Sequence, residues 1–266
     1  MKLVTFGDSW VWGDELGDNS NQYRNTHNIG GLVNKDYSFT EYINYAQPGM
    51  SNTYIMSQIL HYLNSDRYDV DDFLMIGLTS PNRRMEYNNI EKKPFTYTGW
   101  DRSVHLHFTQ DDDYRNDKEY KMWWKGNVKY GMNNRNDFLD YVKICFSIKG
   151  LLESHSKYLV WHSMDSKFME ETINDGYEEI ESKYEYKQED WGEPNLSIFN
   201  TKTLDKNLNT NPNQKWINFS EPVWLTYLQE NFDMNEVGAP SSAHPNELGN
   251  LIWYNDILKK YIKELL

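Results

Sequence analysis

Short apolar runs, each followed by a glycine or a polar turn, mark the strands that we expect in this chain. Leu3–Phe6 runs directly into Gly7, Phe73–Leu78 is the strongest run, and residues 158–162 form another. Runs without polar alternation are typical of parallel strands that are buried on both faces. The weaker candidates are residues 43–46, in a stretch that also suits a helix, and residues 215–219.

Segments with apolar residues three and four positions apart alternate with these strands and predict helices. They are residues 53–64, for which Asn52 is the expected N-cap, residues 136–154 and residues 248–265. Residues 14–36 are polar and rich in Asn and Gly, so we expect a loop or a weak helix there. The alternation predicts an α/β fold, a flavodoxin-like doubly wound parallel sheet between two helical layers.

Two segments interrupt this pattern, and we interpret them as insertions into a single domain of residues 1–266. Residues 86–135 and 165–213 are polar and dense in Asn, Asp, Tyr and Trp. Exposed aromatic rings stack on sugars and anchor interfaces. We expect most of these rings to pack onto the sheet and one or two to face a substrate. They are Trp100, Trp123, Trp124 and Trp191.

Composition narrows the range of partners. The formal net charge of -13 disfavours nucleic acid and anionic membranes, because the surface would repel a polyanion. The single cysteine, Cys145, excludes an intrachain disulfide and a cysteine-rich zinc site. His105 and His107 alternate like metal ligands, but no third well-spaced ligand accompanies them. We therefore expect no metal and no cofactor.

The chain shows neither a targeting segment nor a membrane span. Its first apolar stretch is too short for a signal peptide, and no segment approaches the ~20 apolar residues that cross a bilayer. We expect a soluble, cytoplasmic protein. The many Asn and Tyr residues and few Ala suit an AT-rich genome, such as that of a bacteriophage, which would allow a virion-associated location.

A serine and a histidine at the predicted carboxyl edge of the sheet point to nucleophilic catalysis. Ser9 follows the first strand through Gly7 and Asp8, and His244 precedes the last helix. Sites of open parallel sheets form at this edge, and a serine becomes a nucleophile when a base removes its proton. Ser9 and His244 are therefore the expected nucleophile and base. The backbone N–H groups of Ser9 and Gly49 are the expected oxyanion donors.

Three short blocks of the sequence resemble the SGNH (GDSL-like) hydrolase family of esterases, lipases, acyltransferases and carbohydrate deacetylases. They are Phe-Gly-Asp-Ser at residues 6–9, Ala-Gln-Pro-Gly-Met-Ser-Asn at 46–52 and His-Pro-Asn-Glu-Leu-Gly at 244–249. The resemblance implies the three-layer α/β/α fold of that family. It also implies that the serine of the first block is the nucleophile, that the glycine of the second is an oxyanion donor, and that the histidine of the last block is the base.

The chain departs from that family at two positions. The family's third block is Gly-x-Asn-Asp, and Thr79 stands at the place of the asparagine, so the Thr79 hydroxyl or the Asn82 amide is the expected replacement donor. The family has an aspartate three residues before the histidine, where this chain has Ser241. Three outcomes follow: a dyad hydrolase, a relocated acid, or a fold without activity. Groups that would orient the histidine are Ser241, a backbone carbonyl, Asp233, Glu236 and Glu247.

Four further residues near these blocks are candidates for substrate binding: Asp8, Trp10, Asn52 and Arg83. Three of them also have a purely structural interpretation. Asp8 suits a strand-ending turn, Asn52 suits a helix cap, and Arg83 suits a solvated loop. His162, at the end of a predicted strand, is interpreted as a structural histidine.

The residues favour a serine hydrolase that cleaves an ester, plausibly an O-acyl group on a carbohydrate. A small-molecule or carbohydrate ester is then the expected partner. Carbohydrate is preferred to lipid because the insertions are polar and aromatic and include no long apolar lid. The alternatives are a catalytically lapsed module that binds carbohydrate or protein, and an O-acyltransferase that uses the same residues.

Overall fold

The computed structural model describes residues 1–17, 20–81, 83–88, 93–98, 134–163, 201–218, 221, 223–239 and 244–266. Most of the two predicted insertions lies outside these residues, so the division of the domain stays a prediction. Several residues named above also lie outside the described residues. They are Asn82, His105, His107, Ser241 and the four insertion tryptophans.

A parallel sheet forms the centre of the described structure. Its five strands run in the order β2-β1-β3-β6-β7, and each neighbouring pair is parallel. Counted along the chain this is the order 2-1-3-4-5 of flavodoxin-like folds, which confirms the predicted fold class. The strands are β1 (Leu3–Phe6), β2 (Tyr42–Asn44), β3 (Phe73–Leu78), β6 (Lys157–His162) and β7 (Gln214–Trp216).

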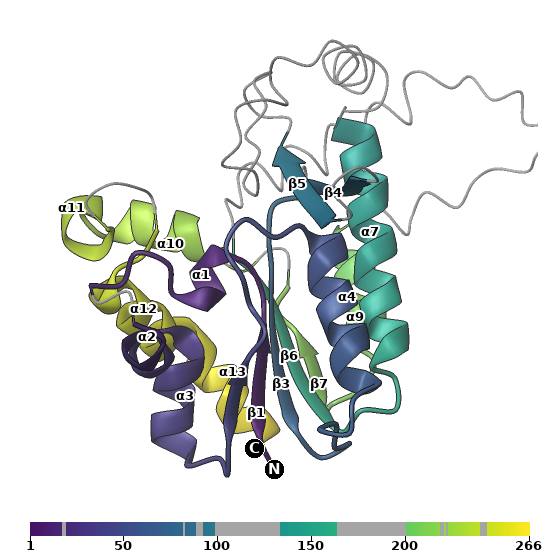
Figure 1. The fold of residues 1–266 in the computed structure, drawn as a ribbon, viewed down its shortest axis with the longest axis horizontal. Coiled ribbons are helices and arrows are strands. Elements are labelled where there is room, and N and C mark those ends of the chain that lie inside the picture. The colour runs from purple at the N-terminus through teal and green to yellow at the C-terminus, as the bar shows by residue number, and fades with distance from the viewer. Residues whose placement is uncertain are drawn as a thin grey trace, which may run out of the picture.

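Helices cover both faces of this sheet (Figure 1). One face is covered by α3 (Ile29–Tyr37), α12 (Glu247–Trp253), the π-helix Tyr254–Leu258 and α13 (Lys259–Leu265). The other is covered by α4 (Asn52–Leu63), α7 (Asn134–Leu151) and α9 (Thr201–Leu208). None of the helices in the described ranges is both long and apolar enough to cross a membrane.

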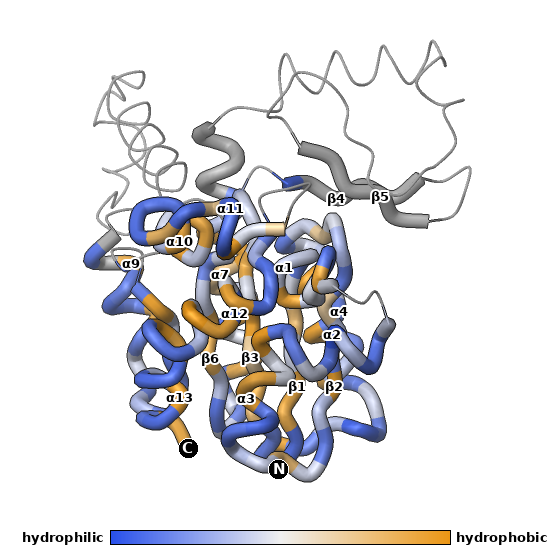
Figure 2. The backbone as a smooth tube through the Cα atoms, turned by 90° about the vertical axis from the view of Figure 1, so that its left-hand side faces the viewer, coloured by the Kyte–Doolittle hydropathy of each residue, from blue (hydrophilic) through white to orange (hydrophobic). Residues whose placement is uncertain are grey.

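The strands supply the core of both layers because successive side chains point to opposite faces. Met75 and Trp161 belong to the cluster under α3, α12 and α13, whereas Ile76 and Val160 belong to the cluster under α4 and α7. Figure 2 shows the result, with hydrophobic colour along β1, β3 and β6 and hydrophilic colour on much of the outer helices. This two-sided burial explains why the strands read as continuous apolar runs.

Helix caps explain one local prediction that was wrong by a residue and one that had two alternatives. Residues 14–36, expected as a loop or weak helix, contain α2 (Asn21–His27) and all of α3 except its last residue. Ser20 caps α2, and Asn28 caps α3 by accepting from the N–H of Gly31 at 2.8 Å. The N-cap of α4 is Ser51 and not Asn52, which is the first helical residue.

Short elements gather at the carboxyl edge of the sheet, at the top of Figure 1. They are α1 (Ser9–Trp12), α10 (Trp224–Asn231), α11 (Met234–Val237) and the antiparallel pair β4 (Arg83–Asn88) and β5 (Lys93–Thr98). Loops at this edge of a parallel sheet are where sites form.

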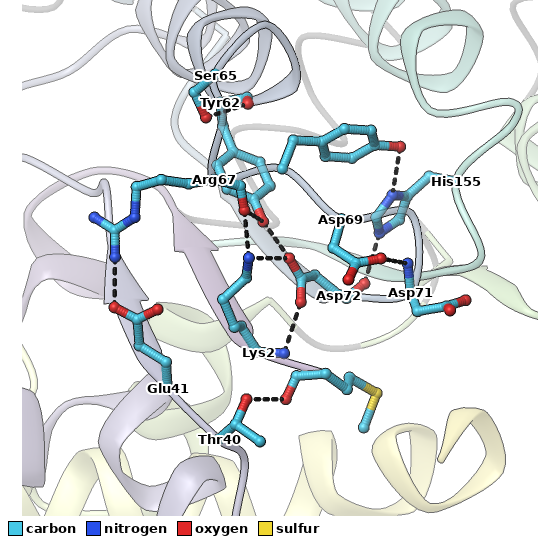
Figure 3. Close-up of polar contacts among 12 residues, drawn as sticks. Lys2, Thr40, Glu41, Tyr62, Ser65, Arg67, Asp69, Asp71, Asp72 and His155 are labelled. Carbon is cyan, nitrogen blue, oxygen red and sulfur yellow. Dashed lines mark hydrogen bonds and ion pairs between the residues drawn. The ribbon is translucent and has the colours of Figure 1, made fainter.

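At the other end of the sheet, where the parallel strands begin, a buried carboxylate is the centre of a polar network, shown in Figure 3. Asp72 accepts from the backbone N–H of Lys2 at 2.7 Å and forms an ion pair with its ammonium group at 3.0 Å. The Tyr62 hydroxyl donates to the same carboxylate, and His155 Nε2 donates to the Asp72 carbonyl. Burial raises the pKa of Asp72, but these hydrogen bonds outweigh it and lower the pKa. The network therefore fastens the first strand to the loop before β3, away from the candidate site.

Candidate active site

Ser9 and His244 meet at the carboxyl edge of the sheet although 235 positions separate them in the sequence. Ser9 Oγ lies 2.8 Å from His244 Nε2, which is hydrogen-bonding distance. The Ser9 residue is 4% exposed and begins α1, directly after β1. The geometry is that of a hydroxyl held against a base.

The turn after β1 explains how the serine is presented. A Cβ at Gly7 would lie 2.3 Å from Val11 Cγ2 and 3.1 Å from the carbonyl oxygen of Gly77, so the position has room only for glycine. Asp8 then caps α1, its Oδ1 accepting from the N–H of Trp10 at 3.1 Å. Glycine and cap together let the chain turn from strand to helix with Ser9 at the first helical position.

The loop that bears His244 is fixed on both sides of the histidine. The His244 carbonyl accepts from the N–H of Ala239 at 2.8 Å, and Pro245 pairs with Gly238 in an antiparallel bridge. Asn246 caps α12 through Gly249 N–H at 3.0 Å. The His-Pro-Asn block therefore positions the imidazole at the start of α12.

Trp10 lies beside the imidazole. Its ring lies 6.1 Å from the ring of His244 and packs edge-on against Trp224 at 5.3 Å. Trp224 in turn stacks on Trp253 of α12. Trp10, a sequence candidate for substrate binding, is buried in this aromatic row and contacts the base instead.

The carboxylate that the structure places at His244 is Glu15, which the sequence analysis did not name. Glu15 Oε2 lies 3.5 Å from His244 Nδ1, the ring nitrogen that faces away from Ser9. The residue follows α1 only a few positions after Ser9. A carboxylate in the loop after the nucleophile, at the same sheet edge, was the signal that could have found it.

Among the orienting groups expected from the sequence, Asp233 and Glu247 have other hydrogen-bond partners. Asp233 caps α11 and accepts from the N–H of Asn235 at 2.9 Å. The backbone carbonyl of Glu236 accepts from the side chain of Asn246 at 2.7 Å. Glu247 accepts from the backbone N–H of Gly17. Ser241 lies outside the described residues.

Two of the expected oxyanion residues lie in loops that are bonded together. Gly49 has a φ of 73°, in the left-handed region that favours glycine. The Asn52 amide bridges both backbone groups of Thr79, donating to its carbonyl at 2.9 Å and accepting from its N–H at 2.8 Å. Thr79 Oγ1 is buried and has no hydrogen-bond partner in the part of the chain that the structure describes. Asn52 is thus a buried residue that links the start of α4 to the loop after β3, and it is not exposed for contact with a substrate.

The remaining two substrate-binding candidates pair with each other beside Ser9. Arg83 Nη1 lies 3.4 Å from Asp8 Oδ2, with side chains 11% and 0% exposed respectively. A buried carboxylate requires such a partner. Asp8 therefore acts inside the fold, both as the cap of α1 and as the counter-ion of Arg83.

His162 lies on the face of the sheet that α4 and α7 cover. Its Nδ1 contacts the hydroxyl of Tyr141 on α7, and burial lowers the pKa of His162 to about 3. The histidine is therefore neutral across the physiological range. Within the described residues, no group of three or more His, Cys, Asp or Glu side chains is arranged to hold a metal ion.

Comparisons with known proteins found similarities among solved structures. No protein-family model and no curated protein matches the chain. The crystal structure of TesA is 10% identical with a TM-score of 0.48, and the match covers 100% of both chains. Phospholipase A1 from Streptomyces albidoflavus NA297 is 11% identical with a TM-score of 0.44, covering 97% of this chain and 98% of that one.

Proposed function

We propose that this chain is a serine hydrolase that cleaves esters through an acyl-enzyme on Ser9. The observation that carries the proposal is the 2.8 Å contact between Ser9 Oγ and His244 Nε2. The chain resembles SGNH hydrolases in the order of its motif residues, and the flavodoxin-like sheet brings those residues to one edge.

The reaction begins with the serine hydroxyl. His244 Nε2 takes the proton of Ser9 as Oγ attacks the acyl carbon, and the carbonyl oxygen becomes an oxyanion. When the tetrahedral intermediate collapses, the C–O bond to the alcohol breaks and His244 returns the proton to the leaving oxygen. A water molecule then attacks the acyl-enzyme while His244 takes its proton. When the second tetrahedral intermediate collapses, the bond between the acyl carbon and Ser9 Oγ breaks and His244 returns the proton to Oγ, releasing the acid and free Ser9.

Three groups are the proposed oxyanion donors. The backbone N–H groups of Ser9 and Gly49 lie in the turns after β1 and β2, and the Thr79 hydroxyl follows β3. The Thr79 hydroxyl is buried and has no partner among the described residues, so it is free to donate a hydrogen bond when negative charge develops on the substrate oxygen. Thr79 would thereby replace the asparagine of the SGNH pattern.

For the substrate we propose an O-acyl group on a carbohydrate. The support is compositional: residues 86–135 and 165–213 are polar and rich in aromatic residues, a composition suited to sugar faces. Acyl transfer to another alcohol uses the same acyl-enzyme. A lapsed site is disfavoured by the contact between Ser9 and His244, because a relic has no need of an aligned hydroxyl and base.

Hydrolysis of p-nitrophenyl acetate tests the proposal. We expect activity in the wild type, loss to the uncatalysed rate in Ser9→Ala, and labelling of Ser9 alone by a fluorophosphonate probe. Ser156→Ala, at the opposite edge of the sheet, is the matched control and should keep full activity. Equal rates for the wild type and Ser9→Ala would refute the proposal that the chain is a serine hydrolase acting through Ser9.

The substrate class needs a second comparison. We expect release of acetate from acetylated xylo-oligosaccharides at a higher kcat/KM than hydrolysis of p-nitrophenyl octanoate. Preference for the octanoate would favour a lipid-like ester. Products that carry the acyl group on an added sugar alcohol, in place of free acid, would identify a transferase.

A further inference from the structure

Resting on the serine-hydrolase function proposed above, we infer that Glu15 is the residue that positions His244 for catalysis. Nucleophile and acid would then lie on one short segment, residues 9–15, and only the base would come from a distant part of the chain. The SGNH pattern instead places its acid just before the histidine, where Ser241 stands here.

Both nitrogens of the imidazole have a partner in this arrangement. Nε2 lies 2.8 Å from Ser9 Oγ, and Nδ1 lies 3.5 Å from Glu15 Oε2. A carboxylate at the second nitrogen holds the tautomer whose Nε2 accepts the serine proton, and it stabilises the imidazolium that follows. The 3.5 Å separation is long for a hydrogen bond, but such contacts are often long without substrate and shorten in the Michaelis complex.

The backbone around Glu15 is bent to bring the carboxylate to this place. After α1 the chain passes through two left-handed residues, Gly13 with φ 83° and Glu15 with φ 61°. The N–H groups of Gly13 and Asp14 both donate to the Ser9 carbonyl, at 3.1 and 2.9 Å. A left-handed glutamate is uncommon, and backbone strain of this kind gathers at functional sites. The two left-handed residues turn the loop so that the Glu15 carboxylate lies beside His244.

A second contact holds the loop against the helix that follows His244. Glu247, the first residue of α12, accepts from the N–H of Gly17 at 2.9 Å and from the Tyr23 hydroxyl at 2.9 Å. Burial raises the pKa of Glu247, but these hydrogen bonds outweigh it and the pKa is lowered. The ionised Glu247 therefore fixes the distance between the two segments that carry Glu15 and His244.

Three other acidic side chains of the described structure near the site have different partners. Asp8 pairs with Arg83, Asp233 caps α11 and Glu247 binds Gly17. The Glu15 side chain is 33% exposed, so its ion pair with the histidine adds little to stability. An ion pair that contributes little to stability, on a strained backbone beside the base, is explained by catalysis.

Four variants separate positioning from structure. Glu15→Gln keeps the shape and removes the charge, and should lower kcat between about 10²- and 10⁴-fold with little change in KM. Glu15→Asp should recover part of the rate. Formate should restore activity to Glu15→Ala, which leaves an open space beside Nδ1, and not to Glu15→Gln, whose amide fills that space. Asp14→Asn, which changes the neighbouring carboxylate, should leave kcat unchanged.

The outcomes distinguish this inference from the function on which it rests. Without ester hydrolysis in the wild type, or without labelling of Ser9, the serine hydrolase itself fails. If Ser9→Ala is inactive while Glu15→Gln keeps wild-type kcat, the hydrolase stands and the role of Glu15 is wrong. Thermal unfolding of each variant shows whether the fold is intact, and formate rescue of Glu15→Ala cannot arise from a folding defect.

Discussion

Asn52 and Thr79 are joined by two hydrogen bonds that link the first residue of α4, just after the loop that follows β2, to the loop after β3. The amide donates to the Thr79 carbonyl at 2.9 Å and accepts from the Thr79 N–H at 2.8 Å. Both residues are almost fully buried. A single side chain therefore satisfies two backbone groups of the turn that presents the Thr79 hydroxyl, and it sets the spacing between two of the proposed oxyanion donors.

Replacing Asn52 by leucine should destabilise the protein and weaken catalysis together. The variant leaves the Thr79 N–H and carbonyl unpaired, and each buried group without a partner costs about 1 to 3 kcal/mol. We expect a loss of about 2 to 4 kcal/mol in the free energy of unfolding by urea, with a lower kcat. Asn64→Ala removes an amide that bonds only an exposed helix end, and it should have a small effect. Similar losses in both variants would contradict the link.

Thr79→Val tests the hydroxyl alone. Valine has nearly the same shape, and Thr79 Oγ1 has no partner among the described residues, so stability should be unchanged or slightly higher. If the hydroxyl donates to the oxyanion, kcat for p-nitrophenyl acetate falls about 10²-fold, and Thr79→Ser keeps most of the activity. Wild-type kcat in the valine variant would remove Thr79 from the oxyanion donors.

The Asp8–Arg83 pair should behave as one unit. Arg83→Gln leaves a fully buried carboxylate without its counter-ion, and the expected loss of stability is about 3 kcal/mol. Asp8→Asn combined with Arg83→Gln should be more stable than Arg83→Gln alone, because the unpaired charge is gone. A double-mutant cycle by urea unfolding measures this coupling. Strictly additive losses would mean that the two side chains do not interact.

The buried His162 should make the free energy of unfolding fall as the pH is lowered. Burial lowers its pKa to about 3, whereas an unfolded histidine titrates near its ordinary value. Below pH ~6.5 the unfolded state therefore binds a proton that the folded state refuses, and stability falls by about 1.4 kcal/mol per pH unit until pH ~3. Urea unfolding between pH 7.5 and 5 should show a shallower slope in His162→Leu than in the wild type. His61→Gln, at an exposed position, should keep the wild-type slope.

Sequence patterns predicted the frame of this molecule better than its site. β1, β3 and β6 are buried on both faces, so their apolar runs were visible without a structure, and their alternation with amphipathic helices indicated the sheet type. α2 and α3 depend on the caps Ser20 and Asn28 more than on an apolar stripe, and so the pattern could not decide between a loop and a weak helix. Glu15 could not be placed because two left-handed residues decide where its loop goes, and a motif search looks next to the histidine.

Glu15 should show opposed effects on stability and activity. Its φ of 61° strains a glutamate and suits a glycine, so Glu15→Gly should keep or raise the free energy of unfolding, by up to about 1 kcal/mol, while ester hydrolysis falls sharply. Ser38 provides the matched control, since its φ is 51° at the end of α3 and it takes no part in the proposed site. Ser38→Gly should give the same change in stability without any change in kcat. If the two variants change stability alike and only Glu15→Gly loses activity, the left-handed conformation of Glu15 serves the chemistry, whereas unchanged kcat in Glu15→Gly would make that conformation an ordinary turn.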